Sequence, residues 1–458
     1  MVKTKNPFPD CLLNIVLPCD IATSGSMNLT AQSIAIFTRR FQMKYSIFSL
    51  LHQALRGQQD WKPAWRDPDP KSEYDIIIIG GGGHGLATAY YLAKEHGLKN
   101  IAVVEKGYIG GGSVGRNTTI VRSNYQEPGN IPFYEWSLKL WEGLEQDFNY
   151  NAMMSQRGVL NLYHSDSQRD EYARRGNAMM MHGVQADLLD REGVRALVPF
   201  LDFDNGRFPI QGGLLQSRGG TARHDAVAWG FARGADSRGV DILQNTEVKQ
   251  IRVENGRAIG VETNRGFIRA KKIGIAAAGN TTRVAETAGL RLPIESYVLQ
   301  AFVTEAIKPL IPCVVTFGGG HFYISQSDKG GLVFGASLDG YTSYAARGNL
   351  PGVEDTIEEA MAIMPGISRV RLLRHWGGIM DMSMDGSPII DKTDIMGLYL
   401  NCGWCYGGFK ATPGSGWCFA HLIAKDETHP NAKALRLDRF ATGHVIDEAG
   451  TGAQPNLH

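Results

Sequence analysis

The clearest pattern in the chain is a short apolar run followed by glycines and a helical stretch. Ile76 to Ile79 form an unbroken β-branched run, which is typical of a strand buried on both faces. Glycines begin at Gly80, and the segment "HGLATAYYLAKEHG" then favours a helix. A second apolar run, "NIAVVEKG", ends in Glu105. The pattern predicts a strand, a tight turn, a helix and a second strand.

A second helix is predicted in the middle of the chain, directly after a glycine-rich turn. Ala228, Phe231, Ala232 and Ala235 recur at helical spacing. The histidine of "ARHDAVAWGFAR", His224, falls in the first turn of this helix. A capping or surface histidine is the ordinary explanation for such a position.

Alternation of apolar and polar residues marks the segment that follows. Residues 240–279 fit a three-stranded excursion that returns to the first sheet and ends at Gly279. Near the C-terminus, "LYLNCGWCYGGFKATPGSG" predicts a strand, another glycine turn and a helix. Segments far apart in the sequence are therefore expected to build one nucleotide-binding sheet.

Composition limits the classes of protein that need to be considered. A chain of 458 residues suggests two domains, and a net charge of +1 gives no reason to expect a nucleic acid or an anionic membrane as partner. No apolar run is long enough to span a bilayer. The six cysteines form no regular framework, so reduced thiols and a cytoplasmic protein are expected, without a metal site. Cys402 and Cys405 have redox-motif spacing, but two buried thiols are the simpler interpretation.

The first 42 residues differ from the rest of the chain. Their apolar stretch, "CLLNIVLPC", is short, contains a proline and leads to no clear cleavage site, which argues against a secretory signal. We expect residues 1–42 to be disordered, or to be absent from the natural product if translation starts at Met43. The segment "MKYSIFSLLHQALRG" predicts a helix.

The first glycine turn has the spacing of a dinucleotide-binding fingerprint. Gly80, Gly82 and Gly85 fit G-x-G-x-x-G, in which the glycines allow a tight turn, a close approach to a pyrophosphate and helix packing. Glu105 stands where an acid accepts hydrogen bonds from the adenosine ribose. The small residues of 110–125 suit a flavin's ribityl chain, with Arg116 and Thr118 as polar contacts, and Val248 is expected near the adenine. The whole arrangement is similar to FAD-dependent amine and amino-acid oxidases.

A narrower resemblance rests on longer motifs. From about Met43 to Asp447 the chain resembles the beta subunits of heterotetrameric sarcosine oxidases, through "GGGGHGLATAYYLAKEHG", "RNTTIVRSNY", "SQRGVLNL", "ARHDAVAWGFAR", "HWGGI" and "GGFKATPGSG". The resemblance implies a Rossmann-like FAD-binding domain interleaved with a mixed-sheet substrate domain. It also implies two flavins, non-covalent FAD and FMN linked through His224. Sarcosine, O2, tetrahydrofolate bound by a partner subunit, and the alpha, gamma and delta subunits are the implied substrates and partners.

The resemblance implies a set of cofactor-binding residues spread over the chain. Besides His224, this set comprises Gly80, Gly82, Gly83, His84, Gly85, Glu105, Gly112, Arg116, Asn117, Thr118, Ile120, Val248, Gly279, His321, Gly407, Gly408 and Lys410.

The expected substrate residues are cationic, because a desolvated carboxylate needs cationic partners. Arg122 and Lys410 match the positions where relatives hold the substrate carboxylate. The alternatives are a surface ion pair for Arg122 and a flavin-phosphate contact for Lys410. Tyr323 matches an active-site tyrosine with a register uncertain by one residue, and His321 is an alternative contact to FMN.

The sequence departs from the family at one turn. Relatives usually have Gly-Trp-Gly before the lysine, whereas this chain has Gly403-Trp404-Cys405. If the missing glycine has a positive φ, a cysteine is strained there. Bulk at this turn can alter activity or substrate choice.

The expected domain organisation alternates between the two domains. Residues 43–154, 213–292 and 380–458 are assigned to the FAD-binding domain, and residues 155–212 and 293–379 to the substrate domain. Two other functions remain open. One is a stand-alone or differently partnered FAD-dependent oxidase or dehydrogenase of proline, glycine or dimethylglycine, and the other is a flavin-binding assembly subunit without catalysis.

Overall fold

The computed structural model describes residues 47–57, 65–204, 207–318 and 322–448. The chain divides into two units, Met1–Arg66 and Asp67–His458. In the first unit the predicted helix is present as α2 (Ile47–Leu55), none of whose side chains is buried. Residues 1–42, for which disorder or absence was expected, lie outside the described residues, as does His321. No helix in the described parts of the chain is both long and apolar enough to cross a membrane.

The first sheet of the larger unit is built around the predicted strand–turn–helix. Its main strand order is β17-β18-β11-β1-β2-β8, and all pairs are parallel except β17 with β18. The β-branched run of β1 pairs with a strand at each edge, and its successive side chains are buried on both faces of the sheet, which explains why the run carries no polar face. The strands of this sheet are β1 (Glu73–Ile79), β2 (Ile101–Val104), β8 (Asp241–Leu243), β9 (Val248–Glu254), β10 (Arg257–Thr263), β11 (Gly266–Ile275), β17 (Ile389–Lys392) and β18 (Leu398–Cys402).

The alternating segment after residue 240 forms the predicted excursion. Strands β9, β10 and β11 pair antiparallel in sequence, and β11 then runs parallel to β1 and β18. The C-terminal part of β11 is therefore central in the sheet, whereas its N-terminal part belongs to the excursion. The predicted C-terminal strand and helix are also present, as β18 and α10 (Thr412–Lys425).

The second sheet is formed by strands from the middle of the chain. Its order is β16-β12-β15-β14-β13-β4-β6-β5, with only β13 and β4 parallel. Aromatic and aliphatic side chains of this sheet pack against α6 (Arg191–Leu197) and α9 (Leu350–Ile363) in one apolar core. The strands are β4 (Val159–Tyr163), β5 (Asp187–Asp190), β6 (Gly212–Gln216), β12 (Ile294–Ala306), β13 (Val314–Thr316), β14 (Tyr323–Gln326), β15 (Gly331–Thr342) and β16 (Leu372–Ser383).

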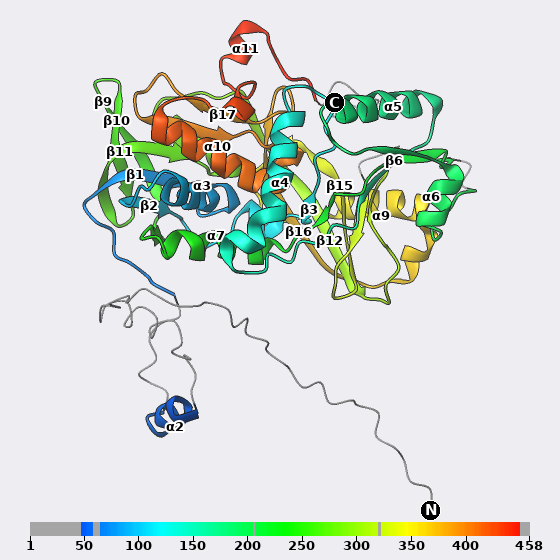
Figure 1. Ribbon diagram of the computed structural model, residues 1–458, viewed down its shortest axis with the longest axis horizontal. Helices are drawn as coiled ribbons and strands as arrows, with labels where there is room; N and C mark the ends of the chain where they lie inside the picture. The colour runs from blue at the N-terminus through cyan, green and yellow to red at the C-terminus, as the bar shows by residue number, and fades with distance from the viewer. Residues whose placement is uncertain (1–46, 58–64, 205–206, 319–321, 449–458) are drawn as a thin grey trace, which may run out of the picture. The chain divides into compact units, whose positions relative to one another are not determined.

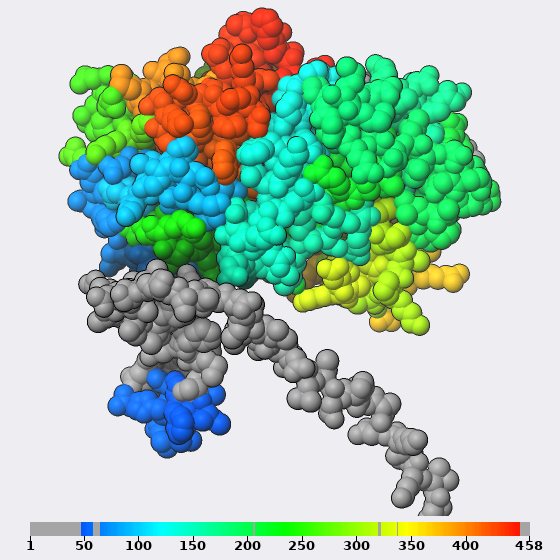
Figure 2. Space-filling model, viewed as in Figure 1, coloured from blue at the N-terminus to red at the C-terminus, as the bar shows by residue number. Residues whose placement is uncertain are grey.

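Helices distant in sequence pack together beside the first sheet. Helix α3 (Gly83–Glu95) lies between α7 (His224–Asp236) and α10 (Figure 1). Gly416 of α10 permits this packing, because a Cβ there would lie 2.4 Å from the Cβ of Ala87. In Figure 2 the blue, green and orange segments accordingly lie next to one another on one face. Helix α4 (Ile131–Phe148) stands between the two sheets in Figure 1.

Candidate flavin and substrate site

A cavity of about 920 Å³ lies between the two sheets of the larger unit. The first sheet contributes Gly82, Glu105 and Val248 to its wall, and the second sheet contributes Tyr323 and Leu299. The cavity is therefore built by both halves of the interleaved fold. Of the predicted site residues, the wall contains Gly80, Gly82, Gly83, His84, Glu105, Gly112, Arg116, Asn117, Thr118, Ile120, Arg122, Val248, Tyr323, Gly408 and Lys410.

The glycine fingerprint has the geometry that close approach of a ligand requires. Gly80 has φ +116°, and a Cβ there would lie 2.3 Å from the carbonyl oxygen of Ala276. A Cβ at Gly85 would lie 1.9 Å from the carbonyl oxygen of Gly80, so this glycine allows α3 to pack on the turn. A Cβ at Gly82 would meet no atom within 4 Å. The space beside Gly82, at the N-terminus of α3, is thus open for a pyrophosphate.

The Glu105 carboxylate fixes the turn at the end of β2. Its two oxygens accept hydrogen bonds from the backbone N–H groups of Gly81 and Gly107, each at 2.8 Å. The carboxylate also lines the cavity, where the remaining lone pairs can accept ribose hydroxyls. Val248, at the start of β9, also lines the cavity, and its contact with an adenine stays a prediction.

His84 connects the fingerprint helix to the lysine-bearing turn. Its Nδ1 hydrogen-bonds Ser415 of α10, and its ring stacks on Trp404 with centroids 4.5 Å apart. Burial lowers the pKa of His84 to about 3, so the imidazole is neutral at physiological pH. A neutral ring at this position supports the cavity wall without adding charge near a flavin.

The segment before β3 (Ile120–Val121) supplies small and polar wall residues. The Arg116 side chain, at the end of the 3₁₀ helix η2 (Ser113–Arg116), donates to the backbone carbonyls of Gly111 and Gly112. The Thr118 hydroxyl donates to the Tyr323 hydroxyl at 3.2 Å, which joins this segment to the second sheet. Burial raises the pKa of Tyr323 to about 12, so its hydroxyl keeps its proton.

Two cations converge at the far end of the cavity. Lys410 is 6% exposed, and its Nζ donates to the backbone carbonyl of Tyr406 at 2.6 Å. Burial and the nearby charge of Arg122 lower the pKa of Lys410 well below its usual value. Among the described residues, neither Arg122 nor Lys410 forms an ion pair, and the Arg122 guanidinium donates to the Asn124 side-chain oxygen. Two basic side chains on one cavity wall, which no carboxylate of the described residues neutralises, are suited to an anionic ligand.

Cys405 occupies a left-handed position, as the sequence comparison suggested for this turn. Gly403 has φ +68°, the backbone of Trp404 is in the right-handed helical region, and Cys405 has φ +48°. This alternation directs successive backbone N–H groups to one side, an arrangement that binds anions. The anion is the buried Asp381, whose carboxylate accepts from the Gly403 N–H at 2.6 Å. Burial raises the pKa of Asp381 to about 6, and the backbone hydrogen bonds oppose this shift.

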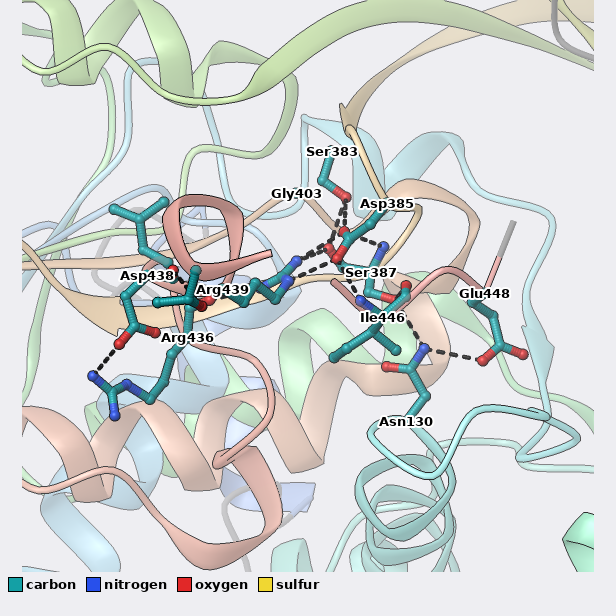
Figure 3. A network of polar contacts seen from close by, with 12 residues as sticks. Asn130, Ser383, Asp385, Ser387, Gly403, Arg436, Asp438, Arg439, Ile446 and Glu448 are labelled. Atoms are coloured by element: carbon teal, nitrogen blue, oxygen red, sulfur yellow. Dashed lines mark hydrogen bonds and ion pairs between the residues drawn. The ribbon is translucent and has the colours of Figure 1, made fainter. Parts of the chain in front are cut away.

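A buried ion pair lies next to the turn at Gly403 (Figure 3). Arg439 of the C-terminal segment donates to both carboxylate oxygens of Asp385, at 2.7 and 2.9 Å. Asp385 accepts from the hydroxyl of Ser383, whose backbone N–H donates to the Cys405 sulfur at 3.3 Å. Both members of the ion pair are 3% exposed at their side chains. The strained turn is therefore held by contacts from several segments.

His224 begins α7 and lies outside the 920 Å³ cavity wall. Burial lowers the pKa of His224, and its Nδ1 is buried and has no hydrogen-bond partner among the residues that the structure describes. The two-stranded sheet of β3 and β7 (Gly220–Thr221) joins the segment before His224 to the cavity-lining segment around Ile120. A neutral, unpartnered imidazole nitrogen fits a covalent attachment point on the outer side of this sheet.

Three predicted cofactor glycines lie behind the wall. Gly85 supports helix packing, a Cβ at Gly279 would lie 2.3 Å from the Ile379 side chain, and one at Gly407 would lie 1.9 Å from the Tyr134 hydroxyl. Sequence reasoning missed Asp381 and Tyr406, both of which line the cavity. Neither follows a motif with a known spacing, although the Tyr406 side chain lies directly beside the predicted turn.

The wall fits FAD in shape and in chemistry. The open space at Gly82 is matched by one at Gly112, where a Cβ would also meet nothing within 4 Å. The Glu105 carboxylate, the N-terminus of α3 and the polar segment of η2 all line the cavity, and they offer groups suited to a ribose, a pyrophosphate and a ribityl chain respectively.

Comparison with known proteins agrees with this geometry. The family described as FAD dependent oxidoreductase (DAO) matches residues 75–422. Sarcosine oxidase subunit beta of Rhizobium meliloti (strain 1021) is 72% identical over 416 residues, which are 91% of this chain and 100% of the relative. The Arthrobacter sp. subunit is 49% identical over 85% of this chain and 96% of its own length. The crystal structure of L-proline dehydrogenase from P. horikoshii has a TM-score of 0.77 and 27% identity over 82% of this chain and 99% of that one. The chain belongs to the FAD-dependent oxidoreductases and, within them, to the family of sarcosine oxidase beta subunits.

Proposed function

We propose that this chain is the FAD-bearing catalytic subunit of a sarcosine oxidase. It oxidises sarcosine to glycine, and the methyl carbon passes to tetrahydrofolate or leaves as formaldehyde. The observation that carries the proposal is the pair of basic side chains, Arg122 and Lys410, which form no ion pair within the described ranges and line a cavity whose chemistry suits FAD. High identity to two sarcosine oxidase beta subunits supports this choice of substrate.

The substrate carboxylate is assigned to the two cations. The Arg122 guanidinium offers a planar fork and the Lys410 ammonium a point charge, so together they suit one carboxylate. A carboxylate beside Lys410 favours its protonated form, whereas burial and Arg122 favour the neutral form. Binding of the anion and protonation of Nζ are therefore coupled. Bound FAD supplies the electron acceptor for the oxidation.

Tyr323 and Tyr406 complete the same end of the cavity. Tyr406 is 40% exposed and lines the cavity, and burial raises the pKa of its hydroxyl above the usual value. The neutral Tyr323 hydroxyl accepts from Thr118 and remains able to donate. These two rings restrict the space beside Arg122 and Lys410, which together form the proposed substrate clamp, and they help to exclude water from it.

The clamp is tested by neutralising each cation. Arg122→Met and Lys410→Met each leave the substrate anion half-paired, so anaerobic reduction of FAD by sarcosine should slow by about two orders of magnitude. Stopped-flow bleaching of the flavin measures this rate. Lys392→Met, at the exposed end of β17, is the control and should keep the wild-type rate. Wild-type rates in both clamp variants would assign the carboxylate to other residues, and faster bleaching by proline than by sarcosine would contradict the substrate.

We further propose that His224 carries a covalent FMN. The proposal rests on the unpartnered Nδ1 and on the neutral state that burial gives to the imidazole. Such a nitrogen can act as the nucleophile in forming a covalent flavin link. Bound FMN would supply a second electron carrier between FAD and oxygen.

The attachment is tested by mass. His224→Ala should remove one FMN from the mass of the denatured protein while non-covalent FAD is retained. His182→Ala, at the exposed C-terminal end of α5 (Asp166–Met181), should keep the increment. A covalent flavin that persists in His224→Ala would place the link on another residue.

Assembly with alpha, gamma and delta subunits completes the proposal. The relatives are named as beta subunits, which implies a multi-subunit enzyme for them. We propose the same assembly for this chain, with tetrahydrofolate bound by a partner subunit and the complex located in the cytoplasm. Co-purification of the three partners with a tagged form of this chain is the corresponding test.

A further inference from the structure

The Arg122 guanidinium is oriented by a chain of side-chain amides. Arg122 donates to the Asn124 side-chain oxygen, and the Asn124 side-chain nitrogen donates to the Asn161 oxygen at 2.8 Å. Asn124 is 1% exposed, and Asn161 lies on β4 of the second sheet and lines the cavity. The chain of amides thus connects the substrate-binding sheet to the cation.

Donor and acceptor chemistry fixes the orientation of each side-chain amide in this series. A guanidinium only donates hydrogen bonds, so the atom of Asn124 that faces Arg122 must be the oxygen. The Asn124 nitrogen must then face Asn161, which in turn presents its own oxygen. The Asn161 nitrogen remains for the Tyr172 hydroxyl on α5, with which Asn161 also interacts. Each amide therefore has one orientation that satisfies its neighbours.

The backbone beneath Arg122 is fixed separately. Ser123 donates from its N–H to the Gln216 side-chain oxygen and from its hydroxyl to Glu135, both at 2.9 Å. The Glu135 carboxylate is itself paired with Arg218, whose Nη1 lies 2.6 Å away. The Glu135 carboxylate is thus already paired with Arg218, and it does not neutralise Arg122. The guanidinium also lies over the Tyr125 ring, 5.0 Å from its centroid.

We infer that Asn124 is a positioning residue, which holds Arg122 toward the substrate carboxylate through a neutral acceptor. A carboxylate at this position would hold the guanidinium equally well but would neutralise it before substrate arrives. An aliphatic residue would leave the charge intact but unoriented. The neutral oxygen of Asn124 therefore orients the guanidinium and leaves its charge uncompensated. This inference rests on the proposed function, because it presupposes an anionic substrate on Arg122.

The test compares an anion with its neutral analogue. Calorimetry on the purified holoenzyme measures the affinity for (methylthio)acetate and for (methylthio)acetamide, which differ only in the carboxylate. Asn124→Asp should weaken binding of the anion by about tenfold or more and leave the amide almost unchanged, because only the anion competes with the new carboxylate for Arg122. A merely structural defect would weaken both ligands alike.

Two further variants make the test decisive. Asn124→Leu should weaken the anion less than Asn124→Asp does, because Arg122 keeps its charge and loses only its orientation. Asn255→Asp, in the exposed turn between β9 and β10, adds the same charge away from the clamp and should bind both ligands like the wild type. If Asn124→Asp retains FAD and wild-type preference for the anion, the inference is wrong while the proposed function stands. If the wild type itself shows no preference for the anion, the proposed function fails together with the inference.

Discussion

At the scale of single residues, Cys405 shows how a fold tolerates local strain. A non-glycine residue in the left-handed region costs about 1–2 kcal/mol, and φ at Cys405 is +48°. The Asp381 carboxylate and the contact of the sulfur with Ser383 hold the turn in place. The strain is therefore offset by neighbouring contacts, and its size can be measured by substitution.

We predict that Cys405→Gly is more stable than Cys405→Ala by about 1 kcal/mol in free energy of unfolding. Both variants lose the sulfur, so the difference between them reports the cost of a Cβ at positive φ. Denaturant unfolding followed by flavin fluorescence measures the two values. Cys402, in β18, is the matched control, since it is equally buried and lies outside the set of residues with positive φ. There the order should reverse, with alanine the more stable, and the same order at both positions would refute strain at Cys405.

Individual site residues were predictable where a motif fixes them. Gly82, Glu105, Arg122 and Lys410 were all expected at the site, and all of them line one cavity. Asp381 was missed because its role depends on a turn more than 20 residues further along the chain. No local pattern in the sequence reports which carboxylate will occupy such a turn.

The roles of the amide residues depend in the same way on tertiary contacts. Asn124 and Asn161 carry ordinary side chains at positions without a chemical motif. Their function emerges only when β4 is placed beside the segment that follows β3. Sequence reasoning placed the cation, and the structure shows what orients it.

At the scale of elements, periodicity predicted the first sheet well. The strand–turn–helix at β1 and α3, the β9–β11 excursion and the C-terminal β18–α10 unit are all confirmed. Each of these units has a local signal, either a β-branched run, strict alternation or a glycine turn before a helix. Local signals suffice where consecutive elements pack together.

The second sheet was predicted only as a mixed sheet, without its strand order. Strand β4 pairs with β13, about 150 residues later, and β12 lies between β15 and β16. Pairings over such distances are decided by packing of whole faces, since each strand alone could pair with several others. The domain boundaries expected from sequence remain predictions.

At the scale of the whole molecule, one cavity is lined by both sheets. Glu105 and Val248, which are assigned to the adenosine, come from the first sheet, whereas Tyr323 and Leu299 come from the second. A dinucleotide that fills the cavity contacts both sheets, and a ligand that fills only the adenine end contacts one. A long ligand should therefore stabilise both sheets, whereas a short ligand should stabilise only the sheet that it contacts.

The last prediction uses this difference in length. Once FAD exceeds its dissociation constant, each further tenfold excess should add about 1.4 kcal/mol to the free energy of unfolding, because only the folded chain offers the assembled cavity. Hydrogen exchange of the FAD-depleted protein then locates the stabilisation. FAD should increase protection in β1 and β2 and also in β12 and β14, whereas ADP, which ends at the pyrophosphate, should protect the first sheet alone. Protection of the first sheet alone by FAD would mean that the second sheet does not contact the cofactor, and the substrate clamp would then have to lie away from the flavin. Protection of both sheets by FAD alone would show that the flavin end of the cofactor holds the two halves of the interleaved fold together.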